Sequence, residues 1–75
     1  MMYKNDVNIN ADVIWRLLSE KKELSIMEIG ELTNFREAFI YLALGWLLRE
    51  DKIHFSEKNG MVYVRLNQIV PEMYF

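Results

Sequence analysis

The sequence predicts an α+β fold in which three helices precede a β-hairpin, and three observations support it. Apolar residues recur at helical spacing as far as about Lys52. From Ile53 to Leu66, apolar and polar residues alternate instead, and Lys58-Asn59-Gly60 divides that stretch as a turn. No repeat or linker interrupts the 75 residues. We therefore expect a single domain over residues 1–75, with 67–75 as an apolar C-terminal tail.

The first predicted helix runs from Ala11 to about Lys21. Asn8 or Asn10 is expected to cap its start. Its apolar residues fall on one arc of a helix that turns about 100° per residue; they are Ala11, Ile14, Trp15, Leu17 and Leu18. Trp15 lies on this arc and Trp46 lies on the core-facing side expected for the third helix. We therefore expect the two indoles to meet in the core.

The second predicted helix is short, from about Ile26 to Thr33. Ser25 and Glu28 have the spacing of a capping box, in which each side chain bonds a backbone N–H of the other residue. The residues expected to face inward are Ile26, Ile29 and Leu32. Gly30 is expected to allow close packing, because glycine inside a helix otherwise costs about 1 kcal/mol.

The third predicted helix, from Phe35 to Asp51, is apolar on two sides. One side carries Phe35, Phe39, Leu42, Ala43 and Trp46, and the other carries Ile40, Leu44, Leu47 and Leu48. A helix needs one apolar stripe to sit on a core, so a second stripe needs another cover. We expect the first side to build the core, and the second to cover the hairpin in part and otherwise contact a partner.

The hairpin strands are expected over Ile53–Glu57 and Met61–Leu66. Val62, Val64 and Leu66 would share one face. His54 is expected to face solvent or to cap a neighbouring strand. Three helices followed by a hairpin are the element order of a winged helix-turn-helix.

Composition excludes several function classes. The chain has no cysteine and one histidine, so we expect no disulfide, no metal site and no cofactor. No nucleophile with a matching base, phosphate loop or small-molecule site is evident, and we expect no enzyme activity. The longest nearly uncharged run, 38–48, is too short to span a membrane, and the N-terminus lacks the apolar region of a secretory signal. A cytoplasmic location is the default expectation.

Several segments resemble a known protein family over about Val7 to Leu66. They are Ile14-Trp15-Arg16-Leu17-Leu18, Ser25 at the second helix, and Ala43-Leu44-Gly45-Trp46-Leu47 followed by Arg49-Glu50-Asp51-Lys52-Ile53. These residues resemble a family of small, functionally uncharacterised winged-helix proteins from Bacteroides-type bacteria. The resemblance implies a winged helix-turn-helix fold, with DNA binding assumed by analogy, and it implies no catalytic residue.

DNA binding would use the third helix and the hairpin, which is the wing of such a fold. The candidate contacts are Asn34, Arg36, Tyr41, Lys58, Asn59 and Arg65. Charge does not support this function, because the net charge is −2 and residues 25–52 carry three basic and five acidic groups. Phosphate contacts supply much of the affinity of DNA-binding proteins, so a reading unit should be the most basic part of the chain.

A homodimer is the expected partner arrangement, because a domain of this size has a small core and no disulfide or metal to reinforce it. The candidate dimer contacts are Ile40, Leu44, Leu48, Met73, Tyr74 and Phe75. The leading hypothesis is a DNA-binding or transcription-regulatory homodimer. The alternative is a protein–protein interaction module on the same scaffold without DNA binding.

Overall fold

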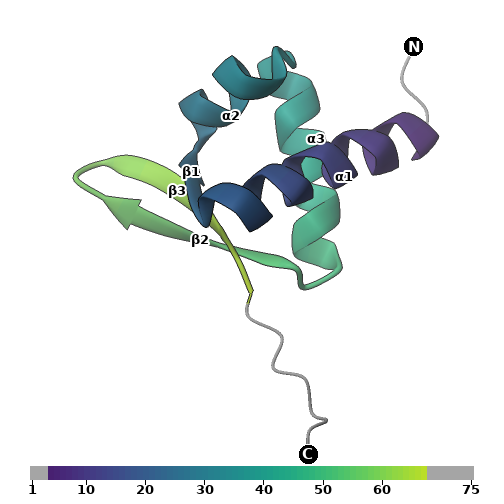
Figure 1. Cartoon of the computed structure of the whole chain (residues 1–75). Coiled ribbons are helices and arrows are strands. Elements are labelled where there is room, and N and C mark those ends of the chain that lie inside the picture. The colour runs from purple at the N-terminus through teal and green to yellow at the C-terminus, as the bar shows by residue number, and fades with distance from the viewer. Residues whose placement is uncertain (1–3, 68–75) are drawn as a thin grey trace, which may run out of the picture.

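The structure is a computed structural model and describes residues 4–67. Three helices pack beside a small antiparallel sheet (Figure 1). The elements are α1 (Lys4–Lys21), β1 (Glu23–Ser25), α2 (Ile26–Thr33), α3 (Glu37–Arg49), β2 (Ile53–Lys58) and β3 (Met61–Leu66). The strand order is β1-β3-β2. The predicted α+β class with three helices and a hairpin is confirmed, and β1 is an additional strand.

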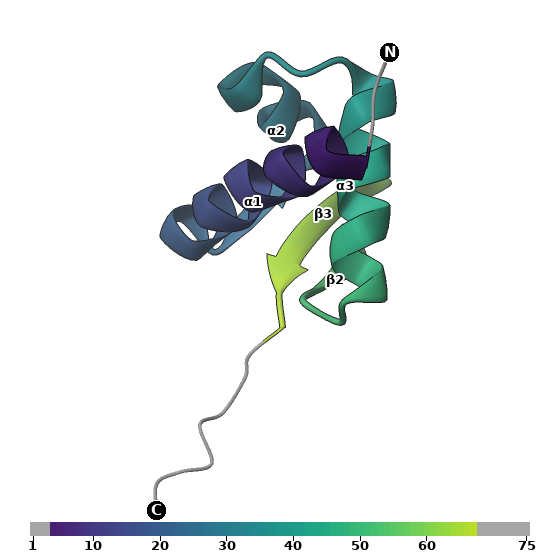
Figure 2. The ribbon, with the colours of Figure 1, turned by 90° about the vertical axis from the view of Figure 1, so that its right-hand side faces the viewer.

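The core gathers one stripe from each helix and one face of the sheet. Its buried apolar residues are Ala11, Ile14, Leu18, Leu24, Ile29, Ile40, Ala43, Leu44, Leu47, Ile53 and Val64. Leu24 and Val64 are register partners, so β1 and β3 direct these two side chains to the same face. The helices cover that face, with α1 crossing α3 (Figure 2).

Helix α1 starts at Lys4, earlier than predicted, so the expected caps Asn8 and Asn10 lie inside it. Half-buried Val7 extends the buried series Ala11, Ile14 and Leu18 backwards at helical spacing. Trp15 is 37% exposed and Lys52 Nζ lies 5.7 Å from its ring centroid. The predicted place of Trp15 in the core is therefore wrong. Among residues 4–67, no helix combines the length and apolarity needed to cross a bilayer.

Helix α2 has its predicted bounds, and the capping box is confirmed. Glu28 N–H donates to Ser25 Oγ at 3.1 Å, and Ser25 N–H donates to Glu28 Oε1 at 2.8 Å. Leu32 is half exposed, so its predicted inward position is wrong. A Cβ on Gly30 would lie 3.6 Å from Ile40 Cδ1, an ordinary contact, so space alone does not require glycine there.

Helix α3 is shorter than predicted and turns the opposite side to the core. Asn34 at φ 64° ends α2, and Phe35 N–H donates to Thr33 Oγ1, so the helix starts only at Glu37. Ile40 and Leu44 are 2% exposed. Their predicted place on an outward stripe is therefore wrong, as is the predicted core position of Leu42, which is half exposed. Phe35 and Trp46 pack at the edge of the core.

The hairpin closes with a two-residue turn, Asn59-Gly60, in which both residues have positive φ (52° and 79°). These angles are those of a type I′ turn, and Lys58 belongs to β2 rather than to the turn. Val64 is buried, but Val62, two residues nearer the tip on the same strand, is exposed. The dimer contacts predicted at Met73, Tyr74 and Phe75 lie outside the described residues.

Asn67 joins the end of β3 to the connection between α3 and β2. Its backbone N–H donates to Lys52 O at 2.9 Å, and its Nδ2 donates to Asp51 O at 2.8 Å and to Ile53 O at 3.2 Å. With Nδ2 used as the donor, Asn67 Oδ1 is the acceptor for Nδ1–H of exposed His54 at 2.7 Å. Asn67, predicted as the first residue of the tail, is therefore part of the folded domain.

Candidate functional site

The side of α3 that faces away from the core forms a continuous exposed surface. We call it the outer face of α3, and it consists of Ala38, Tyr41, Leu42, Gly45, Leu48 and Arg49. Their spacing of three and four residues places them on one side of a helix. Tyr41, Leu42 and Leu48 are 52%, 51% and 48% exposed. The surface that a winged-helix domain usually presents to a partner is here mostly apolar.

Opposite charges flank the two ends of the outer face. Glu37 lies in the first turn of α3 and Arg49 in the last, where the helix dipole favours each charge. The Tyr41 hydroxyl donates to Glu37 Oε2 at 3.2 Å. The negative charge of Glu37, with this hydrogen bond, raises the pKa of Tyr41 above its ordinary value. Arg49 forms no ion pair with any residue in 4–67.

Gly45 lies in the middle of α3 without an evident reason inside the chain. It has no positive φ, and among the described residues no heavy atom beyond its chain neighbours and the adjacent backbone of α3 lies within 4 Å of a Cβ placed there. Glycine at such a position costs about 1 kcal/mol of helix stability relative to alanine. Gly45 adds no side chain to the outer face between Leu42 and Leu48.

The residues predicted to contact DNA from the helical side lie around the start of α3. Asn34 is the left-handed C-cap of α2, Arg36 is the N-cap of α3, and Tyr41 lies one turn into the helix. All three are exposed. Only Tyr41 projects from the outer face, and its hydroxyl is already bonded to Glu37. The structure thus supplies one cation, Arg36, at this end.

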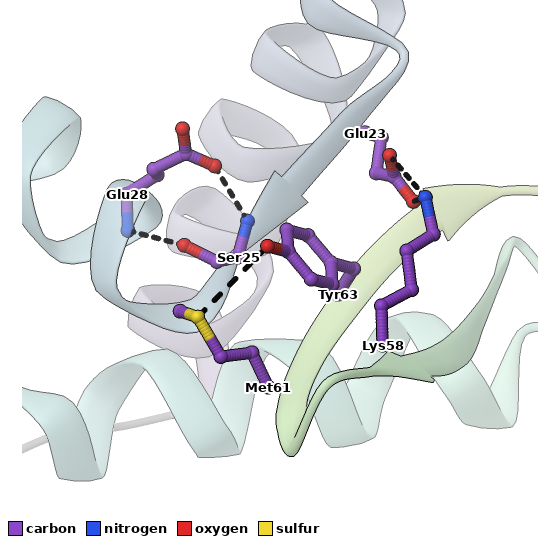
Figure 3. A network of polar contacts seen from close by, with 6 residues as sticks. All are labelled: Glu23, Ser25, Glu28, Lys58, Met61 and Tyr63. Carbon is purple, nitrogen blue, oxygen red and sulfur yellow. Dashed lines mark hydrogen bonds and ion pairs between the residues drawn. The ribbon is translucent and has the colours of Figure 1, made fainter.

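The predicted wing contacts do not gather at the tip. Lys58 extends across the sheet to β1, where Nζ lies 3.2 Å from Oε1 and 3.1 Å from Oε2 of Glu23 (Figure 3). Lys58 Nζ also lies 5.4 Å from the ring centroid of Tyr63. Arg65 is exposed beside Glu23 and His54 on the neighbouring strands, and Asn59 is exposed in the turn. Sequence reasoning missed the Glu23–Lys58 pair because it did not predict β1.

The described part of the molecule has depressions beside α3 and beside the sheet. One, of about 400 Å³, lies between α2 and α3 beside the outer face and is lined by Ile26, Met27, Gly30, Phe35, Glu37, Ile40 and Tyr41. The other, of about 540 Å³, is lined by Leu18, Ser19, Lys22, His54, Arg65 and Leu66. In the second, Ser19 Oγ donates to Trp15 O at 3.1 Å rather than pairing with His54. Within residues 4–67, no group of three or more metal-binding side chains is placed to hold an ion.

Comparison with known proteins identifies the fold family. The model of the winged helix-turn-helix domain family DUF2582 matches residues 2–66. The chain belongs to this family. The solution NMR structure of protein BT2368 from Bacteroides thetaiotaomicron is similar, with 35% sequence identity and a TM-score of 0.78. The match covers 87% of this chain and 79% of that one. No curated protein matches the sequence.

This membership confirms the predicted winged helix-turn-helix fold and the predicted resemblance to a small family of this kind. The chain is a winged-helix domain, a scaffold that makes DNA contact a natural expectation. Fold does not fix function, however, and function has to be argued from the residues that the domain presents. In this member of the DUF2582 family those residues are the outer face of α3 and the wing.

Proposed function

We propose that this winged-helix domain is a non-enzymatic regulatory domain that binds protein through the outer face of α3. One observation carries the proposal: Tyr41, Leu42 and Leu48 are each about half exposed on the helix that occupies the recognition position. Base edges are read mainly by arginine, lysine, asparagine and glutamine. An apolar face with a tyrosine, by contrast, has the composition of the centre of a protein interface.

The electrostatics of the same region support protein contact over DNA contact. Residues 25–52 carry three basic and five acidic groups, and Glu37 stands at the start of α3. A carboxylate at that point repels the phosphates that a recognition helix approaches. On the wing, the charge of Lys58 is compensated by Glu23. Residues 25–52 thus have an acidic excess where a recognition helix would make phosphate contacts, which are the main source of affinity for DNA.

DNA binding is the second candidate, and the fold together with the exposed positions of Arg36, Asn59 and Arg65 favours it. Under this alternative, the N-terminal end of α3 would enter the major groove and the wing would contact the backbone beside it. Binding would then weaken steeply as salt is added, because each phosphate contact releases counterions.

A photo-crosslinking experiment separates the two candidates at a single residue. A variant that carries p-benzoylphenylalanine in place of Leu42 is produced in cells and irradiated. We expect adducts that resist nuclease and disappear on protease treatment. A matched variant carries the crosslinker in place of Ile9, which is 61% exposed on α1, and reports the background of a solvent-facing apolar position. Leu42 adducts that nuclease removes would overturn the proposal in favour of DNA.

Fluorescence anisotropy with a mixed-sequence duplex at low salt gives an independent check. We expect no binding at micromolar protein concentration. Binding that weakens as salt rises, and weakens further in an Arg36→Ala variant, would contradict the proposal.

A further inference from the structure

We infer that the protein bound by the outer face is a second copy of this chain, with the two α3 helices packed antiparallel across a two-fold axis. The inference rests on the proposed function, because it names the occupant of the same surface. It is carried by how charge and side-chain size are distributed along α3, and by the position of Gly45.

Charge fixes the direction of the pairing. In a two-fold antiparallel pair whose axis passes at the level of Ala43, Glu37 lies opposite Arg49 of the second copy, and the reverse contact follows by symmetry. Each end of the interface would then hold one carboxylate and one guanidinium. A parallel pair would place Glu37 against Glu37 and Arg49 against Arg49, which is unfavourable at both ends.

Side-chain size supports the same register. With the axis at Ala43, Tyr41 lies opposite Gly45 of the second copy, and Ala38 lies opposite Leu48. Two of the three large exposed side chains, Tyr41 and Leu48, therefore each meet a small one. Alternation of large and small residues lets two helices approach closely and interdigitate. The same register therefore places opposite charges at the ends of the helix pair and small residues opposite Tyr41 and Leu48.

Gly45, the small residue opposite Tyr41, is also unusual within its own helix. A glycine in mid-helix weakens the helix, and nothing within the described chain lies near enough to its missing Cβ to require it. In the antiparallel pair, the ring of Tyr41 from the second copy packs over Gly45. The pairing thus gives a reason for a residue that has none in a single chain.

The size of the surface is adequate for a helix pair. The 13 residues of α3 extend about 20 Å, and the outer face runs along most of that length. Three half-exposed large apolar side chains on one face form a patch that favours association. A small domain without disulfides gains much of its missing stabilisation from such a contact.

The test begins with the mass of the full-length protein. Sedimentation velocity and light scattering over a concentration series should give twice the 9.0 kDa of one chain. A Leu42→Glu variant should weaken the dimer at least about tenfold, while Ile9→Glu, at an exposed apolar site on α1, should leave it unchanged. Circular dichroism confirms that each variant is folded. A mass of one chain at every concentration would overturn the inference.

A charge-swap experiment tests the register. Glu37→Arg and Arg49→Glu should each weaken the dimer, because each places like charges opposite one another. The double variant should restore the dissociation constant to within about threefold of the original. A double variant as weak as the two single variants would refute the antiparallel arrangement.

Gly45→Gln separates folding from pairing. Glutamine favours the helix over glycine, so the midpoint of thermal unfolding of the monomer should rise while the dimer weakens. A dimer as strong as the original would refute the Tyr41–Gly45 contact. A chain ending at Asn67 should still dimerise; loss of the dimer would place the interface on residues 68–75 instead.

The inference and the proposed function fail in different ways. Nuclease-resistant adducts at Leu42 in a chain that stays monomeric would retain a protein-binding face and exclude a second copy as its occupant. The opposite result would be Leu42 adducts that nuclease removes, in a chain whose outer face pairs only when DNA is absent. That result would reject the proposed function and assign the surface to DNA.

Discussion

The assignment of the two sides of α3 can be tested by comparing Leu44→Ala with Leu42→Ala. Leu44 is 2% exposed in the core and Leu42 is 51% exposed on the same helix. Removing a buried leucine side chain costs roughly 2–5 kcal/mol, because apolar burial is lost and a cavity remains. An exposed site away from such features changes stability by less than about 0.5 kcal/mol. Helix propensity differs little between leucine and alanine and affects both variants equally.

Because the domain is small, the difference in stability between the two variants is a large fraction of its free energy of unfolding. A single core of this size supplies roughly 3–5 kcal/mol, so Leu44→Ala should remove half or more of the free energy of unfolding. With an m-value of about 1–3 kcal/mol per molar urea, its midpoint should fall by about 1 M or more, and that of Leu42→Ala should hardly move. Circular dichroism at a concentration where light scattering shows monomers excludes any effect of pairing. If Leu42→Ala costs as much as Leu44→Ala, the two faces have been assigned wrongly.

Three further predictions concern side-chain hydrogen bonds of Ser25, Asn67 and Tyr41. Ser25→Ala removes the capping box and should cost about 1 kcal/mol, measured as a lower thermal midpoint, whereas Ser19→Ala, at an exposed hydroxyl, should have little effect. Asn67→Ala removes the side-chain bonds that hold the end of the hairpin and should cost about 1–3 kcal/mol; hydrogen exchange of the amides around 51–54 should accelerate, and unchanged exchange would contradict this role. Glu37→Gln removes the charge that disfavours the phenolate, so the pKa of Tyr41 should fall toward its ordinary value in an NMR titration. Because the pKa of Tyr41 is raised in the folded state, this contact contributes to stability below the ordinary pKa of tyrosine, and the contribution is lost as pH rises through the folded-state pKa. An unchanged Tyr41 titration in the Glu37→Gln variant would refute the attribution to Glu37.

The parts of the fold that sequence reasoning predicted are those with strong local signals. The capping box at Ser25 and Glu28 defines α2 because both partners are three residues apart. Asn59-Gly60 defines the hairpin because both positions need positive φ. Strand β1, in contrast, has three residues, too few to display alternation, and it pairs with β3 about forty residues later in the chain. The formation of β1 depends on the free edge of β3, which is brought next to it only when the chain folds.

The orientation of α3 could not be predicted from its own residues, because both sides are apolar. The side with Phe39, Leu42 and Trp46 was predicted to build the core. The structure buries Ile40, Leu44 and Leu47 of the other side, together with Ala43 of the side predicted to face the core. Which of two apolar sides is buried depends on how α1 packs against α3, and the small residue Ala43 lies in that buried face. That packing depends on a neighbouring helix and not on the periodicity of α3.

The same correction changes which residues carry function. Of the predicted dimer contacts on α3, Ile40 and Leu44 are in the core, and Leu48 alone is on the outer face. The expectation of a second apolar side still holds, with Tyr41 and Leu42 in their place. This exposed side is the one that a winged helix would insert into a groove. DNA reading by α3 and pairing of α3 would therefore need the same surface, so the two contacts would exclude one another. The residues of that surface, and Gly45 above all, favour the second chain.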